Sequence, residues 1–157
     1  MKTEKTKILS YFLIIFSIGV VAGLGSLFVN LGMGWFSGLD IPTQFPPNFI
    51  IPIVWSVIYI IFAIVLCSWI SSKGFIPGKI VFLLIVNGIL NILWCLIFFT
   101  LEQTFGGIIS IILLLISSYI LVYNIYKEKK IYGYFAALYP VWASIATTLN
   151  IALWILN

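Results

Sequence analysis

The sequence predicts an all-α integral membrane protein: a bundle of five transmembrane helices with a cytoplasmic N-terminus and the C-terminus outside. Three observations predict this fold. Hydrophobic residues fill 63% of the 157 positions and charged residues only 8%, whereas soluble domains are about half apolar and about a quarter charged. Five uncharged stretches follow one another, each long enough to cross a bilayer. The lysines fall only at alternate boundaries between these stretches.

The uncharged stretches give the helices in order. They are residues 8–39, 41–72, 80–101, 103–126 and 131–157. Because a helix needs about 20 apolar residues to span the hydrocarbon core, we expect helices at about 8–30, 47–70, 80–100, 104–126 and 133–155. The stretches are continuously apolar, which excludes the alternating strands of a membrane barrel. The chain, residues 1–157, is expected to form a single transmembrane domain.

The first connection, residues 31–47, differs from the other three in length and composition. Its glycines and prolines predict that it is not a continuous helix, and it is also aromatic; these residues are Gly32, Gly34, Trp35, Phe36, Gly38, Pro42, Phe45, Pro46 and Pro47. Long loops of this kind tend to be functional, so we expect a structured lid. The alternative is an aromatic belt at the membrane surface.

The lysines predict the orientation. They precede the first helix, lie between the second and third, and follow the fourth; they are Lys2, Lys5, Lys7, Lys73, Lys79, Lys127, Lys129 and Lys130. With five crossings these segments share one side, and the other side carries Asp40 and Glu102 without any lysine. Since cytoplasmic loops carry the excess of lysine, we expect the lysine side in the cytoplasm. We expect a multi-pass protein of a bacterial cell membrane.

Three of the predicted helices carry stripes of aromatic and polar residues. Positions at helical spacing share a face, and the stripes are Trp55, Tyr59, Phe62 and Leu66; Asn87, Asn91, Trp94 and Phe98; and Tyr139, Trp142, Ala146 and Asn150. Polar groups are costly in lipid, so these faces should point into the bundle. Two interpretations stay open: a pocket wall, or a solid core in which asparagines tie helices together.

The first helix has a stripe of small and polar residues: Gly19, Gly23, Ser26 and Asn30. The Gly-x3-Gly spacing lets helices approach closely. The stripe predicts either a contact within the chain or the seam of a homodimer.

Missing residue types exclude several kinds of chemistry. The chain has no histidine, and no acid or lysine lies inside a predicted span, which argues against a His-ligated metal and against a charge-lined ion path. The net charge of +4 comes from the lysine side and reports topology. We therefore expect no metal ion, no cofactor and no nucleic-acid partner.

A series of motifs runs from the first loop to the last helix. It comprises Trp35-Phe36, Leu39, Pro42, Pro46-Pro47 and Pro52-Ile-Val-Trp55 with Tyr59; then Asn87-x3-Asn91-x2-Trp94 with Phe98-Phe99; and then Tyr139-Pro140-Val141-Trp142-Ala143-x2-Ala146-x2-Leu149-Asn150. In residue type, order and spacing, this series resembles the translocator protein family (TspO/MBR), also called tryptophan-rich sensory protein or peripheral benzodiazepine receptor.

The resemblance implies a five-helix bundle, usually dimeric, with a pocket beneath the first loop. Members bind tetrapyrroles such as protoporphyrin IX, and some bind cholesterol or synthetic ligands; some bacterial members promote light-dependent breakdown of the porphyrin. By position, the family's pocket residues correspond to Trp55, Asn87, Asn91, Trp94, Trp142 and Ala146, with Trp35 and Pro47 in the lid. Trp55 and Trp142 correspond to the tryptophans linked to the light-dependent reaction. Tyr59 and Asn150, from the stripes, complete the predicted ligand-binding set.

The chain departs from the family pattern at three positions. Phe36 stands where a tyrosine is usual, Gln44 where a tryptophan is frequent, and Ser110 where an acid is frequent. The function expected from the resemblance is a receptor or sensor for porphyrins or related flat apolar ligands. The alternatives are a light-dependent porphyrin-degrading enzyme and a transporter of amphipathic molecules such as tetrapyrroles or sterols. The expected partners are a porphyrin or another hydrophobic small molecule, the lipid bilayer and a second copy of the chain.

Overall fold

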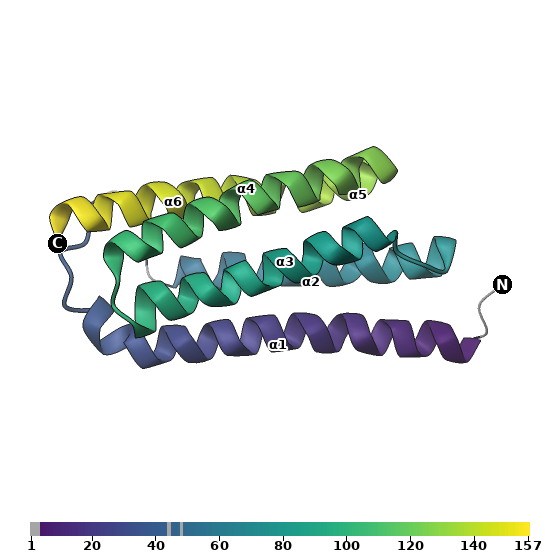
Figure 1. Cartoon of the computed structure of the whole chain (residues 1–157), viewed down its shortest axis with the longest axis horizontal. Coiled ribbons are helices and arrows are strands. Elements are labelled where there is room, and N and C mark those ends of the chain that lie inside the picture. Colours follow the sequence, from purple (N-terminus) through teal and green to yellow (C-terminus); the bar gives the residue numbers. More distant parts are fainter. Residues whose placement is uncertain (1–3, 44, 48) are drawn as a thin grey trace.

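Apolar helices run side by side along the long axis of the molecule (Figure 1). The computed structural model describes residues 4–43, 45–47 and 49–157. Its helices are α1 (Glu4–Phe36), α2 (Ile50–Lys73), α3 (Gly78–Cys95), the π-helical turn η1 (Leu96–Thr100), α4 (Thr104–Glu128), α5 (Lys130–Ala136) and α6 (Leu138–Leu156). With η1 continuing α3, and α5 joined to α6, the described residues make five spans long and apolar enough to cross a membrane. The predicted fold class is confirmed.

Helix α1 continues beyond its predicted end, so the expectation that residues 31–36 are not helical was wrong. The cause is the seam between α1 and η1. A Cβ atom at Gly32 would overlap the backbone of Phe99, and the Thr100 hydroxyl donates to the Phe28 carbonyl at 2.8 Å. Glycine here permits close helix packing, as it commonly does in membrane helices.

Two other helix boundaries differ from the prediction. Helix α2 begins at Ile50 and not at 47, and the Ile50 N–H donates to the Pro47 carbonyl at 2.8 Å. The last span is interrupted at Ala137 between α5 and α6. Pro140 has no N–H to donate to the carbonyl of Ala136, four residues earlier, and its ring clashes with that carbonyl, so the regular helical hydrogen bonding is interrupted here.

The π-helical turn η1 replaces the last turn of the predicted third helix. The Leu101 N–H donates to the Leu96 carbonyl at 2.9 Å, and the Gln103 N–H donates to the Ile97 carbonyl at 3.1 Å. Phe98 and Phe99 are both buried there. Such wider turns are rare and often lie at functional sites.

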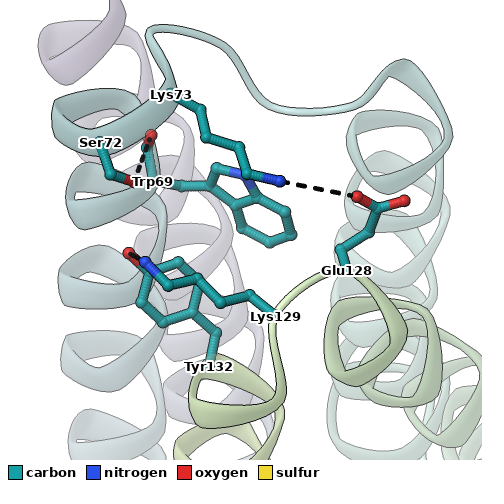
Figure 2. A network of polar contacts seen from close by, with 6 residues as sticks. All are labelled: Trp69, Ser72, Lys73, Glu128, Lys129 and Tyr132. Atoms are coloured by element: carbon teal, nitrogen blue, oxygen red, sulfur yellow. Dashed lines mark hydrogen bonds and ion pairs between the residues drawn. The ribbon is translucent and has the colours of Figure 1, made fainter.

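The lysine-bearing segments meet at one end of the bundle, as the orientation argument requires (Figure 1). Lys2 lies outside the described residues. At this end Lys73 approaches Glu128 at 4.0 Å, and the Lys129 ammonium lies 4.1 Å from the centre of the Tyr132 ring. Figure 2 shows both lysines beside the buried Trp69. The Lys73–Glu128 contact joins α2 to α4, and the Trp69 and Tyr132 rings, 5.4 Å apart, join α2 to α5. Which side of the membrane this end occupies stays a prediction.

The small-residue stripe of α1 faces outward. Gly19, Gly23, Ser26 and Asn30 are exposed, and no atom from another part of the described chain lies within 4 Å of a Cβ built on either glycine. The predicted alternative of a contact within the chain is therefore wrong. The homodimer seam stays a prediction.

A thiol-labelling experiment tests the orientation. The variants Lys79→Cys and Glu102→Cys place exposed cysteines at opposite ends. We expect a membrane-impermeant maleimide to label Glu102→Cys in intact cells, and Lys79→Cys only after permeabilisation, because the lysine excess predicts that this end is cytoplasmic. The reverse pattern would invert the topology.

A substitution at Gly32 tests the α1–η1 seam. In Gly32→Val the new side chain meets the Phe99 backbone, so we expect a lower melting temperature in detergent, corresponding to about 1–3 kcal/mol of overpacking. Gly34→Val is the matched control, because no atom lies within 4 Å of its Cβ position. Equal melting temperatures for the two variants would show that the close approach is not needed.

Candidate functional site

All but two of the predicted site residues line one or both of two spaces in the bundle. The first, here called the loop pocket, has a volume of about 40 Å³ and includes Phe45 of the first connection in its wall. The second, here called the lateral cavity, has a volume of about 540 Å³ and lies among α1, α2 and α3. Trp55 lines both spaces. The sequence had predicted one pocket.

The loop pocket has an aromatic wall. Of the predicted site residues it brings together Trp55, Trp94, Trp142, Ala146 and Asn150. The Trp55 and Trp94 rings lie 5.9 Å apart, with 33° between their planes. The pocket has room for only a few water molecules, so in this structure its aromatic side chains pack against one another.

Of the three tryptophans that line the loop pocket, Trp94 and Trp142 differ in the hydrogen bonding of their N–H groups. Trp94 Nε1 donates to Asn150 Oδ1 at 3.2 Å, and Asn150 Nδ2 donates to the Ala146 carbonyl at 2.9 Å. Trp142 is only 7% exposed, and its Nε1 has no hydrogen-bond partner among the described residues. A buried donor without a partner costs about 1–3 kcal/mol, which an acceptor atom on a ligand would recover.

The lateral cavity brings together the remaining polar residues of the predicted site. Tyr59, Asn87 and Asn91 line it, as does Tyr139. The Tyr59 hydroxyl donates to Asn91 Oδ1 at 3.2 Å, and the Tyr139 hydroxyl donates to Asn87 Oδ1 at 2.8 Å. Asn87 Nδ2 then donates to Ser117 Oγ at 2.7 Å. The asparagine faces do point into the bundle, as predicted.

Trp55 separates the two spaces. Its ring lies 6.1 Å from the Tyr59 ring and 5.9 Å from the Tyr139 ring. The same side chain also contacts Trp94 of the loop pocket. A change in the Trp55 rotamer would therefore alter both spaces.

The predicted lid residues Trp35 and Pro47 line neither space. Trp35 belongs to α1, and its ring packs edge-on against Phe98 at 5.6 Å. Pro47 is exposed, and its carbonyl accepts the Ile50 N–H at 2.8 Å. The first connection instead contributes Phe45, which lies 6.2 Å from the Phe36 ring; both side chains line the loop pocket.

The first connection is also held by the last residue of the chain. The Asp40 N–H donates to Asn157 Oδ1 at 2.8 Å, and Asn157 Nδ2 donates to the Asp40 carbonyl at 3.1 Å. No motif in the sequence pointed to Asn157. Ser117 was also missed, although a serine inside an apolar span is a recognisable signal.

Two of the three departures from the family pattern can be placed in the structure. Phe36 lines the loop pocket, where a tyrosine would have added a hydroxyl. Ser110 is buried in α4 and donates to the Gly107 carbonyl at 2.9 Å, and it lines neither space. Gln44 lies outside the described residues.

Comparisons with known proteins agree with this architecture. The sequence model of the TspO/MBR family matches residues 12–155. The chain is 27% identical to Protein CrtK of Rhodobacter capsulatus, over 95% of this chain and 94% of that protein. It is 29% identical to the Tryptophan-rich protein TspO of Archaeoglobus fulgidus, over 96% of this chain and 97% of that protein. It is 23% identical to the Tryptophan-rich protein TspO of Bacillus cereus, over 85% and 88%.

The family match covers nearly the whole chain, including all five spans and both spaces between them. The chain therefore belongs to the TspO/MBR family of membrane proteins.

Proposed function

We propose that this membrane protein of the receptor or sensor type binds protoporphyrin IX or a related flat tetrapyrrole in the loop pocket. The observation that carries the proposal is that the buried Nε1 of Trp142 has no hydrogen-bond partner among the described residues. Trp142 lines the loop pocket together with Trp55 and Trp94. Indole faces stack on a wide aromatic ring system, and the free N–H can donate to an acceptor on the ligand.

The position of the loop pocket suits an amphiphilic ligand. A porphyrin carries two carboxylates at one edge, and charged groups are costly at bilayer depth. The loop pocket lies beside the first connection, at the end of the bundle where α1 and α6 end (Figure 1). The ring can therefore be buried while the carboxylates remain near water.

The loop pocket has to open before it can hold such a ligand. Pockets for ligands of this kind have volumes of about 300–1,000 Å³, whereas the loop pocket has about 40 Å³. Opening moves Phe45 away from Phe36 and strains the two hydrogen bonds between Asp40 and Asn157. The first connection thus acts as the lid of the proposed site.

A titration with protoporphyrin IX in darkness, followed by quenching of tryptophan fluorescence, tests the site. We expect Trp142→Phe to weaken binding by roughly five-fold, because the hydrogen bond from Nε1 is lost while the ring face is kept. We expect Trp55→Phe to weaken it as well, through a smaller stacking surface. Trp154→Phe is the matched control, because Trp154 is exposed on α6 and packs on Phe105.

Equal affinities for Trp142→Phe, Trp154→Phe and the unaltered protein would remove the loop pocket as the porphyrin site. The same samples under illumination examine the enzymatic alternative. Loss of porphyrin absorbance that requires both light and Trp55 or Trp142 would indicate degradation in addition to binding.

The lid can be tested through Asn157. In Asn157→Ala both hydrogen bonds to Asp40 are lost, so opening costs less and protoporphyrin IX should associate faster in stopped-flow measurements. Asn124→Ala is the control, since Asn124 donates only to the Ile120 carbonyl within α4. An unchanged association rate in Asn157→Ala would mean that the first connection does not gate the pocket.

A further inference from the structure

We propose that the end of the bundle where the lysine-bearing segments meet holds a binding site for the phosphate group of an anionic lipid. The site, here called the headgroup site, consists of Trp69 and Lys73 on α2 and Lys129 between α4 and α5. None of the three residues lines the loop pocket or the lateral cavity, and the first connection lies at the other end of α2 (Figure 1). The headgroup site is therefore separate from the proposed porphyrin site.

Trp69 carries a buried N–H group that lacks an acceptor. Its side chain is 0% exposed, and its Nε1 has no hydrogen-bond partner among the described residues. Leaving a buried donor without an acceptor is unfavourable. Trp69 lies only four residues before Lys73, the last residue of α2, so an acceptor near the end of this helix is within reach of the indole.

The Lys73 ammonium is held loosely. It lies 4.0 Å from Glu128 Oε2, which is longer than a hydrogen bond, and ion pairs between exposed side chains contribute little. It also lies 6.0 Å from the centre of the Trp69 ring, at the outer limit of a cation–π contact. Figure 2 shows the Lys73 side chain lying over the indole. A stronger acceptor can therefore draw the ammonium from Glu128 and uncover the Trp69 N–H.

Lys129 supplies a second ammonium beside the first. Its Nζ donates to the Tyr132 hydroxyl at 2.9 Å and lies 4.1 Å from the centre of that ring. Because an ammonium has three protons to donate, two remain for another acceptor. The Tyr132 and Trp69 rings are 5.4 Å apart, so the two lysine side chains lie over neighbouring rings (Figure 2).

These donors suit a phosphate group. Two ammonium groups and one neutral N–H offer positive charge and several donors, and a phosphate offers negative charge and several acceptor oxygens. Hydrogen bonds between charged partners are about twice as strong as neutral ones. Such a bond can therefore replace the loose contact with Glu128.

The position of the headgroup site favours a lipid as the source of the phosphate. Helix α2 has 24 residues and is about 36 Å long at the helical rise of about 1.5 Å per residue. The hydrocarbon core of a bilayer is only about 30 Å thick, so the last turn of α2 reaches the level of the lipid phosphates. Lysines next to a membrane span attract anionic lipids.

Native mass spectrometry of the protein purified in detergent tests the site by counting bound lipids. We expect phosphatidylglycerol to saturate one site more tightly than phosphatidylcholine, whose headgroup has no net charge. Lys73→Gln and Lys129→Gln should each weaken phosphatidylglycerol binding about ten-fold, because a charged hydrogen bond is lost. Lys127→Gln is the matched control, since Lys127 lies at the same end but its ammonium lies over the Tyr123 ring at 4.9 Å.

Removal of the competing carboxylate should act in the opposite direction. In Glu128→Gln the phosphate no longer competes for Lys73, so we expect phosphatidylglycerol to bind about three-fold tighter, as suits the weakness of an exposed ion pair. Glu4→Gln removes the same charge from the start of α1, at the same end of the bundle, and should leave the affinity unchanged.

Nuclear magnetic resonance of the indole N–H groups tests the contact with Trp69. Short-chain phosphatidylglycerol should move the Trp69 resonance, which is assigned by its absence in Trp69→Phe, and should leave the Trp154 resonance in place at the other end of the bundle. Inorganic phosphate at the same concentration should move neither. An equal shift with inorganic phosphate would assign the site to a soluble phosphate in place of a lipid.

Two results would overturn the headgroup site itself. Equal phosphatidylglycerol affinity in Lys73→Gln, Lys129→Gln and Lys127→Gln would mean that the lysines attract anionic lipid only through their summed charge. An unmoved Trp69 resonance at saturating lipid would remove the indole from the site. Melting temperatures in detergent establish that the variants are folded.

Discussion

The interior of this protein depends on two groups of hydrogen bonds that meet on α3, at Asn87 and Asn91. Tyr59 of α2 donates to Asn91 of α3, Tyr139 of α6 donates to Asn87 of α3, and Asn87 donates to Ser117 of α4. Polar groups at bilayer depth have no water to bond, so they must satisfy one another. Their partners fix how α2, α3, α4 and α6 face each other. Helix α1 makes none of these bonds, and its residues form part of the wall of the lateral cavity.

The same hydrogen bonds explain why the interior is divided. Trp55 packs on Tyr59 and Tyr139, so the hydrogen bonds that hold these tyrosines also hold the indole between the two spaces. On one side lies the loop pocket of about 40 Å³, where the Trp142 N–H has no partner among the described residues. On the other side lies the lateral cavity of about 540 Å³. The two spaces thus differ more than ten-fold in volume.

Much of the fold follows from the sequence alone, because apolar length and lysine placement are local properties. The five spans and the inward asparagine faces were predicted correctly. The helical conformation of residues 31–36 was not predicted. It goes with the close packing of Gly32 against the backbone of Phe99, a residue that is remote in sequence. The division of the site was also missed, since helical spacing predicts which residues share a face but not how far α1 stands from its neighbours. Asn157 carries no motif, and its role arises only from tertiary contact with Asp40.

The most direct test of this account is an experimental structure of the protein with protoporphyrin IX bound. We expect porphyrin density against Trp142, beneath a displaced first connection, with Trp55 between the porphyrin and the lateral cavity. Porphyrin density in the lateral cavity, along α1 and α3, would contradict the account.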